Sequence, residues 1–303
     1  MNRRGFLAGN AALSALAMAS GTQALATGRE EGRGLRIPAG TRAEDMAFSQ
    51  VRSEFIFFDD PVEEFRQHLR LERDLVEDEG STLTWYHWIA YVIPAGRTPF
   101  PLMAYEGIEY SYFRRVADME YRIHAHNLSY VRDIHTGEFL ETIENPLTGK
   151  TVKAMPTVLL HDPGTLASPK GFRNLSGTGQ YSKPYRRFRI EDNLLKLDSI
   201  RTAPPDWPST HMENSCQWTD LRYFENPTIT SLPVHFAGSY VFPYLPWLEM
   251  GDLPGHMLGF FDGRKLNNAA EIPRDFLERT ERLYPELLQP RWEEFERPIP
   301  FPL

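Results

Sequence analysis

The stretch "TLTWYHWIAYVIP" at residues 82–94 decides the fold, because it begins a long series of predicted β-strands. It is rich in aromatic and β-branched residues, which favour strands, and Pro94-Ala95-Gly96 then supplies a turn. Similar patterns follow at hairpin distances, over residues 101–116, 119–133, 138–145 and 150–160. Successive strands joined by short turns predict an antiparallel sheet.

Strand patterns return in the second half of the chain, over residues 185–202, 211–224, 231–242 and 257–263. With about nine strands in one sheet, we expect a mainly β (α+β) fold with a strongly bent sheet or barrel. Two peripheral helices are predicted, one from Asp59-Asp60-Pro61 to Gly80 and one over residues 273–283. Residues 161–183 contain Gly, Ser and Pro and predict a long loop, with a lid as one interpretation.

The N-terminus has the features of an export signal. Arg3-Arg4 precedes a mildly apolar, Ala-rich run, and Ala24-Leu25-Ala26 matches an A-x-A cleavage site. Residues 1–26 therefore predict a twin-arginine signal peptide that is cleaved near Ala26. This implies the twin-arginine export machinery as a partner and the periplasm as the location of the folded protein. Residues 27–50 predict a flexible arm, and residues 51–303 a single β-rich domain.

Composition excludes several partners and classes of protein. The formal net charge is −8, and removal of Arg3 and Arg4 takes it to −10, so nucleic acid and anionic membrane surfaces are poor partners. No apolar segment beyond the leader is long enough to predict a stable membrane span. Cys216 is the sole cysteine, which excludes an internal disulfide. Motifs of serine hydrolases, P-loop NTPases and dinucleotide-binding enzymes are missing, so no organic cofactor is expected.

Two histidines, His124 and His126, stand one residue apart in the predicted strand at 119–133. Side chains alternate along a strand, so both must share one face with Leu128 and Tyr130. We expect this face to line a pocket for a hydrophobic or aromatic small molecule. The predicted lining residues of that pocket are Trp85, His87, Tyr91, Tyr105 and Tyr110, with Trp247 in a proline-rich lid or plug.

This pocket suggests acid–base chemistry without a cofactor. His124 or His126 would transfer protons near neutral pH, Glu106 would orient or charge the imidazole, and Tyr130 would stabilise negative charge. These roles predict a lyase or isomerase that acts on a hydrophobic, aromatic or phenolic molecule. A non-catalytic binding protein with the same pocket is the alternative, and these residues do not decide between the two.

The spacing around the two histidines does not favour a metal. A cupin-type site requires a glycine six residues before the first histidine and a carboxylate four or five residues after the second. Those positions hold Asp118, Tyr130 and Val131. Because ligand geometry is specific, we expect no metal at this pair.

A second pattern leaves a metal-dependent alternative open. His211-Met212-Glu213 places a histidine and a carboxylate on one face of a predicted strand. With His235 or His256 as a distant third ligand, it would form the two-histidine, one-carboxylate triad of iron oxygenases. The third hypothesis is therefore a metal-dependent oxygenase that uses His211, Glu213 and His256.

Several motifs resemble those of a known family. They are Trp85-Tyr86-His87-Trp88, Tyr105-Glu106-Gly107, "NPLTGKTV" at 145–152, "PYLPWLEMGDLPGHML" at 243–258 with "GRKL" at 263–266, and "IPRDFLERTERLYPELLQPRW" at 272–292. In order and spacing, over roughly residues 50–295, the chain resembles the bacterial family catalogued as domain of unknown function 1838. The resemblance implies a single β-rich domain. It assigns no active site.

Overall fold

The computed structural model describes residues 53–74, 78–159, 164–175, 181–182, 185–202 and 212–298. They belong to one compact unit, Val51–Leu303. The predicted signal peptide, the predicted arm and His211 lie outside the described residues. Among the residues that are described, no helix is both long and apolar enough to cross a membrane.

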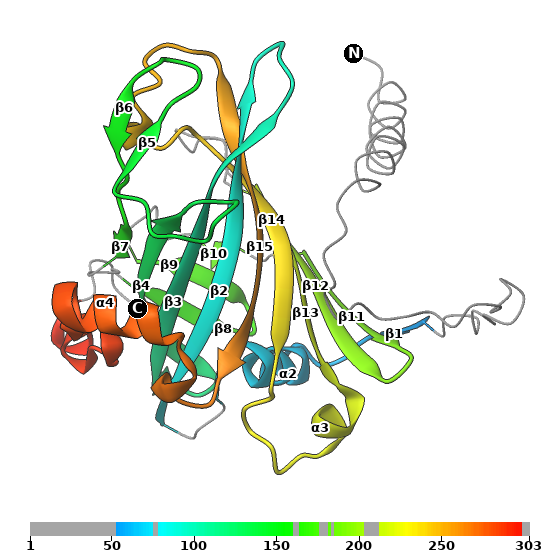
Figure 1. Ribbon diagram of the computed structural model, residues 1–303. Coiled ribbons are helices and arrows are strands. Elements are labelled where there is room, and N and C mark those ends of the chain that lie inside the picture. The colour runs from blue at the N-terminus through cyan, green and yellow to red at the C-terminus, as the bar shows by residue number, and fades with distance from the viewer. Residues whose placement is uncertain are drawn as a thin grey trace, which may run out of the picture. The chain divides into compact units, whose positions relative to one another are not determined.

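The fold is built on one antiparallel sheet of 13 strands (Figure 1). The strands lie in the order β1 (Ser53–Ile56), β11 (Tyr185–Glu191), β12 (Leu194–Thr202), β13 (Met212–Asp220), β14 (His235–Phe242), β15 (Gly255–Leu266), β2 (Glu79–Pro94), β3 (Phe100–Ala117), β4 (Glu120–Arg132), β8 (Thr165–Ser168), β9 (Gly171–Asn174) and β10 (Tyr181–Ser182). In addition, β7 (Thr157–Leu159) pairs with β4, and β5 (Thr142–Glu144) pairs with β6 (Thr151–Lys153). The predicted mainly β fold with a bent antiparallel sheet is confirmed, and the described sheet is open, because β1 and β10 do not pair.

The sheet has more strands than the predicted nine because some predicted segments are hairpins. Residues 185–202 form β11 and β12, which turn at Asp192, a residue with a φ of 54°. Such positive φ values suit Asp and Asn in two-residue hairpin loops. The predicted loop at 161–183 contains the hairpin β8–β9, in which Ser168 pairs with Gly171. The prediction of a loop without strands is therefore wrong for the described part of that segment.

The two predicted helices are present, and only one boundary differs. α2 (Pro61–Glu72) begins as predicted, since the Asp60 carboxylate accepts a hydrogen bond from the Val62 amide at 2.9 Å. It ends eight residues before the predicted Gly80, because Gly80 already pairs with Phe113 in the sheet. α4 (Arg274–Leu283) agrees with the predicted helix at 273–283.

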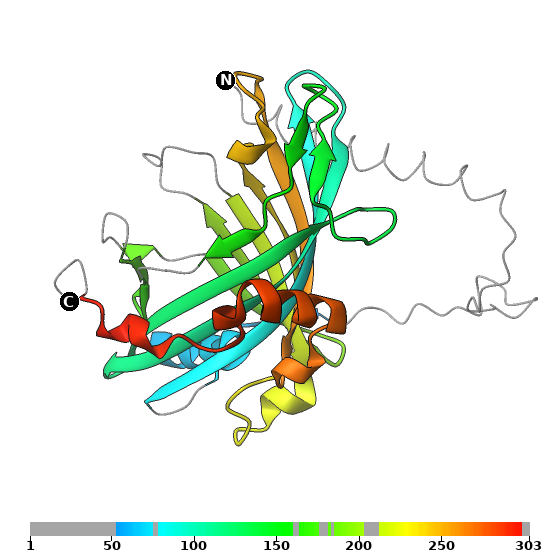
Figure 2. The ribbon, with the colours of Figure 1, turned by 60° about the vertical axis from the view of Figure 1, so that its left-hand side comes forward.

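The two faces of the long strands β2, β3 and β4 have different neighbours. We call the face that carries Thr84, Tyr86 and Trp88 the inner face, and the face that carries Trp85 and His87 the outer face. α4 and the short helices η3 (Pro285–Leu288) and η4 (Trp292–Glu296) cover the outer face (Figure 2). The apolar side chains buried there include Leu83, Ile108, Leu128, Phe276, Leu287 and Phe295. Their burial attaches the C-terminal segment to the sheet.

The inner face is filled at both ends by apolar side chains. At the lower end in Figure 1, α2 packs against the sheet through Phe65 and Leu69, and Leu71 joins a cluster with Leu195 and Leu197. At the upper end an aromatic cluster contains Trp88, Tyr105, Tyr240 and Phe242. Trp88 and Tyr105 stack at 4.2 Å with an interplanar angle of 7°. The inner face between these two clusters is not apolar.

Gly107 allows the strands to approach closely at this middle part of the inner face. A Cβ atom there would lie 2.5 Å from the Tyr86 hydroxyl and 2.5 Å from the carbonyl oxygen of Leu128. Because the carbonyl belongs to a paired strand, it cannot move aside without loss of pairing. We expect Gly107→Ala to lower the free energy of unfolding by about 2–3 kcal/mol, measured by urea denaturation.

A second glycine separates crowding from backbone strain. Gly96 lies in an exposed turn with a φ of 70°, and a Cβ atom there would have no neighbour within 4 Å. We expect Gly96→Ala to cost only about 1 kcal/mol, from backbone strain alone. If Gly107→Ala proved no more costly than Gly96→Ala, the strands around Tyr86 would be free to separate.

Candidate functional site

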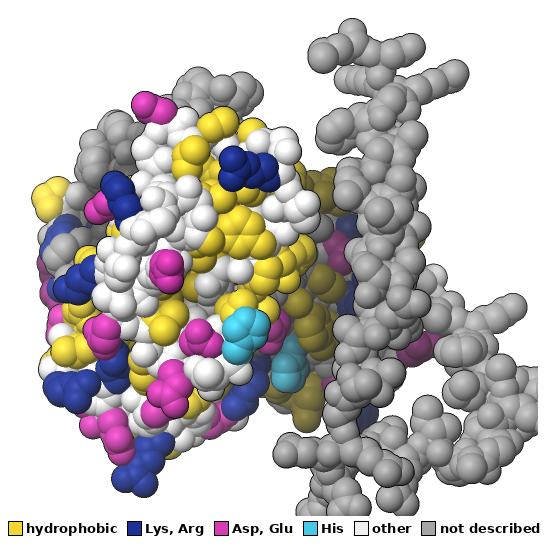
Figure 3. Space-filling view, turned by 45° about the horizontal axis from the view of Figure 1, so that its top comes forward, with side chains coloured by type: hydrophobic (Ala, Val, Ile, Leu, Met, Phe, Trp, Pro, Cys, Tyr) yellow, Lys and Arg dark blue, Asp and Glu magenta, His cyan; other side chains and the backbone are white. Residues whose placement is uncertain are grey.

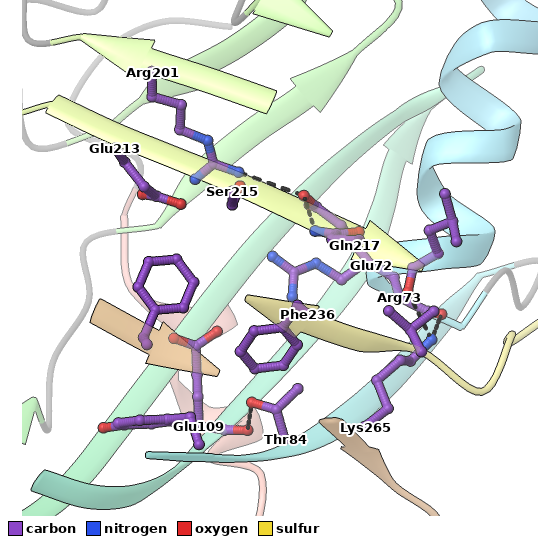
Figure 4. A pocket seen from close by; sticks show the side chains of 14 residues that line it. Glu72, Arg73, Thr84, Glu109, Arg201, Glu213, Ser215, Gln217, Phe236 and Lys265 are labelled. Atoms are coloured by element: carbon purple, nitrogen blue, oxygen red, sulfur yellow. Dashed lines mark hydrogen bonds and ion pairs between the residues drawn. The ribbon is translucent and has the colours of Figure 1, made fainter. Parts of the chain in front are cut away.

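A cavity of about 260 Å³ lies on the inner face between the two apolar clusters (Figure 4). Strands β12 and β13 line one side and β2 and β3 the other, with β14, β15 and the C-terminal end of α2 between them. Six of its lining residues have acidic or basic side chains: Glu72, Arg73, Glu109, Arg201, Glu213 and Lys265. The others are Leu71, Thr84, Tyr86, Ser215, Gln217, Val234, Phe236 and Phe261.

The ionisable lining distinguishes this cavity from a packing defect. Charged side chains are costly to remove from water unless they are paired or hydrogen-bonded, and the six here are partly buried or exposed. A sheet face with only a structural role would continue the apolar clusters that lie above and below. Convergence of ionisable groups in one cavity is typical of a functional site.

Glu72 is held as a fixed anion at one wall of the cavity. Its Oε1 accepts hydrogen bonds from Gln217 Nε2 at 3.1 Å and Arg201 Nη2 at 3.4 Å, and its Oε2 lies 3.1 Å from His68 Nε2. Burial opposes ionisation of Glu72, but His68, Arg201 and Arg73 outweigh it and hold its pKa well below the usual range. Burial lowers the pKa of His68 to about 4, so at neutral pH the imidazole beside the carboxylate is neutral.

Lys265 fastens the C-terminal end of α2 to β15. Its Nζ donates hydrogen bonds to the carbonyl oxygens of Arg73 at 2.7 Å, Leu71 at 3.1 Å and Arg70 at 3.5 Å. Burial and the charge of Arg73 lower the pKa of Lys265 to about 7. Positive charge at the end of a helix also interacts favourably with the helix dipole. Lys265 is thus committed to the wall of the cavity.

Tyr86 and Arg201 keep their protons. The Tyr86 hydroxyl donates to Asn127 Oδ1 at 2.6 Å, and burial raises the pKa of Tyr86. Burial would lower the pKa of Arg201, but the carboxylates of Glu72, Glu213 and Glu109 outweigh it and raise the value. Near neutral pH the cavity therefore contains a neutral phenol and a permanent guanidinium cation.

Two of the six acidic or basic side chains, those of Arg73 and Glu213, are not engaged by other described residues. Neither the Arg73 guanidinium nor the Glu213 carboxylate makes a hydrogen bond or ion pair with another described residue. Arg73 ends α2, and its Nε atom is buried. Figure 4 shows Glu213 and Arg201 on one wall and Glu109 on the facing wall, with their side chains directed into the space between. Arg73 and Glu213 are thus the ionisable groups best placed to contact a ligand.

The predicted catalytic histidines lie elsewhere. His124, His126 and Tyr130 share one face of β4, but it is the outer face, covered by the C-terminal segment. His124 and His126 are 1% and 0% exposed. The histidine side chains seen at the surface in Figure 3 are therefore other residues. His124 packs edge-on against Phe295 at 4.8 Å. The expectation that this face lines the pocket is corrected, because the described cavity lies on the other side of the sheet.

His126 has the features of a structural residue. Its Nε2 lies 3.1 Å from the carbonyl oxygen of Leu287 in η3, and burial lowers its pKa to about 4. Glu106 does not approach either histidine, because it pairs with Arg132 Nε at 2.5 Å and lies opposite Tyr130. The residue of β3 opposite His126 is Tyr110. Glu106 lies four residues from Tyr110, which is about 13 Å along the strand. The predicted His–Glu–Tyr arrangement is not formed.

Most of the predicted substrate-binding residues also lie on the outer face. The ring of Trp85 packs edge-on against that of Phe276, with 5.0 Å between the ring centroids. The centroids of the Tyr110 and His126 rings are 5.3 Å apart. On the part of this face that the C-terminal segment leaves open, His87 lies 3.8 Å from Asp262. Tyr91 packs there against Phe260 at 5.5 Å.

Tyr105 and Trp247 are the two predicted binding residues that the structure brings together. Tyr105 lies on the inner face in the aromatic cluster above the cavity, and Trp247 in η1 (Pro246–Leu248) packs against the same cluster. Neither residue lines the cavity itself. Trp247 therefore packs on the apolar core and not in the lining of the cavity, and its role as lid or plug stays a prediction.

The predicted metal triad does not assemble in the described residues. Glu213 lies on the inner face, opposite Tyr240 of the neighbouring strand β14. His256 lies opposite Ile93 of β2 and points to the outer face. His211 lies outside the described residues. No group of three or more His, Cys, Asp or Glu side chains in the described ranges is arranged to hold a metal ion.

No family model matches the sequence, and no curated protein matches it. The resemblance to domain of unknown function 1838 therefore stays a prediction. The candidate site depends on geometry alone.

Proposed function

We propose that the cavity is the active site of an enzyme that performs acid–base chemistry on a small polar molecule. The observation that carries this proposal is the convergence of six acidic or basic side chains on the inner face, two of which are not engaged by other described residues. In this proposal Glu213 accepts and returns the proton. The Glu213 carboxylate helps to raise the pKa of Arg201, so a permanent cation acts on the same part of the cavity.

The remaining lining residues suit such a reaction. Phe236 and Phe261 give apolar walls for the carbon skeleton of a substrate, and Tyr86 provides a phenol that remains protonated. Gln217 and Arg201 both donate hydrogen bonds to the Glu72 carboxylate. These three side chains are therefore organised before a substrate binds. The proposal keeps the predicted reaction class, a lyase or isomerase, but assigns the proton transfer to Glu213 in place of His124 or His126. The substrate is more polar than the predicted hydrophobic molecule. With the predicted export, it would be encountered in the periplasm.

Replacement of Glu213 by Gln tests the catalytic role. Substrates are first sought by ligand-observed NMR with a library of small hydroxy, keto and unsaturated compounds, followed by assays of turnover. We expect Glu213→Gln to reduce kcat at least 100-fold, about 3 kcal/mol of transition-state stabilisation, because an amide cannot accept the proton. Substrate affinity should change far less.

A matched control and a decisive alternative accompany this test. Glu144→Gln changes an exposed carboxylate on β5, remote from the cavity lining, and should leave kcat unchanged. Full turnover in Glu213→Gln would refute the assignment of Glu213. If the wild-type protein bound ligands in the cavity but transformed none of them, the alternative of a binding protein would be correct.

A further inference from the structure

Resting on the proposed function, we infer that the ligand of the cavity is a small carboxylic acid whose carboxylate is bound by Arg73. The inference begins with the charges around the end of α2. The guanidinium groups of Arg73, Arg186 and Arg201 all act electrostatically on the Glu72 carboxylate. Glu72 is the one carboxylate on which all three guanidinium groups act, so cations are concentrated around it, while Glu64 also acts on Arg186 and Asp74 on Lys265.

Arg73 is the cation at this end that the cavity leaves unsatisfied. Arg201 donates to Glu72, and Lys265 donates to three backbone carbonyls. The Arg73 guanidinium lines the cavity, its Nε is buried, and it has no hydrogen-bond partner among the described residues. Because Nε is buried, the terminal Nη groups of the guanidinium are the donors that a ligand in the cavity would contact. The backbone carbonyl of Arg73 is already used by Lys265 and Ser231.

The chemistry of the guanidinium selects the ligand group. Its planar, fork-shaped donors match the two oxygens of a carboxylate. A phosphate monoester carries nearly two negative charges at neutral pH and would require a second free cation. Glu213 and Glu109 would repel a second anionic group elsewhere in the cavity. A monoanionic carboxylate with an uncharged body against Phe236 and Phe261 fits this distribution.

Binding of three matched probes tests this inference. Benzoate, benzamide and phenyl phosphate share one aromatic ring and differ in the charge of the attached group. We expect wild-type protein to bind benzoate at least about tenfold more tightly than benzamide or phenyl phosphate, measured by titration calorimetry. Amide shifts in ¹H–¹⁵N spectra should locate the site at residues 71–73 and 213–217. Equal affinities for the three probes, or no binding of benzoate, would overturn the inference.

Variants of Arg73 identify the residue responsible. Arg73→Met should weaken benzoate binding at least about tenfold and leave benzamide binding within about twofold. Arg73→Lys keeps the charge but loses the planar, bidentate donors, so it should recover part of the affinity for benzoate. It also keeps the inference testable if Arg73→Met does not fold. Arg97→Met, at an exposed turn remote from the cavity lining, should behave as wild type. If Arg73→Met bound benzoate normally, the inference would fail, whereas the Glu213→Gln test of turnover would still stand.

Discussion

Replacement of Arg70 by methionine is expected to lower the free energy of unfolding by about 3 kcal/mol. Arg70 is 6% exposed and ties α2 to the segment that contains α3 (Leu221–Glu225). Its guanidinium donates to the carbonyl oxygens of Asn226 at 2.8 Å, Ile229 at 3.0 Å, Phe224 at 3.1 Å and Tyr223 at 3.5 Å. Methionine keeps much of the apolar contact but leaves these acceptors without their donor. Denaturation in urea measures the loss.

A neighbouring arginine on the same helix provides the matched control. Arg66 is exposed and pairs with Glu63 one turn away. Exposed ion pairs contribute little, so Arg66→Met should change stability by less than about 0.5 kcal/mol. Equal effects of the two substitutions would show that the carbonyl contacts of Arg70 do not hold α2 in place.

Acid is expected to destabilise the protein well above the pH at which most carboxylates titrate. His68 and His126 have pKa values of about 4 in the folded state, lowered from 6.5 by burial. Between pH 6.5 and 4 the unfolded chain binds these protons and the folded protein does not, so stability falls as pH is lowered. Each histidine should contribute about 3 kcal/mol to the loss over this range, measured by denaturant unfolding at a series of pH values.

One substitution isolates the contribution of His126. Gln at this position cannot titrate, but its amide can still donate to the carbonyl oxygen of Leu287. The difference in stability between wild type and His126→Gln should therefore change by about 3 kcal/mol from pH 7 to pH 4. A constant difference over this range would mean that His126 is protonated in the folded protein as readily as in the unfolded chain.

Much of the fold could be predicted because the sequence signals were local. Aromatic and β-branched residues with intervening turns located β2, β3 and β4, and the Asp60-Pro61 pair located the start of α2. The errors arose where a turn signal was read as strand. In residues 185–202, Asp192-Asn193 is the turn between β11 and β12. Short strands such as β8 and β9 exist through pairing with β4 and each other, which depends on residues distant in sequence.

The site could not be predicted in the same way, because its location depends on which strand face is inner. Alternation correctly placed His124 and His126 on one face, but it does not state which face the C-terminal helices cover. One signal for the inner face was available. The aromatic stretch 100–113 contains two carboxylates, Glu106 and Glu109, and only Glu109 lies one position out of phase with Tyr110.

The other cavity residues come from distant segments. Glu72 and Arg73 end a helix, Arg201 and Glu213 belong to β12 and β13, and Lys265 belongs to β15. Glu213 did appear in the sequence-based predictions, but as a metal ligand beside His211. No pattern within one segment shows that these residues meet, since the bend of the sheet brings them together.

The separate occupants of the two sheet faces restrict how this protein can change in length during evolution. One residue gained or lost inside β2, β3 or β4 would exchange inner and outer side chains beyond that point. The charged lining of the cavity would then face α4, and the apolar surface that holds α4 would face the cavity. We therefore expect homologous proteins to vary in length at the hairpin loops, or in the strands only where a β-bulge absorbs the extra residue. The irregular pairing at Ala90–Tyr91 already marks one such position.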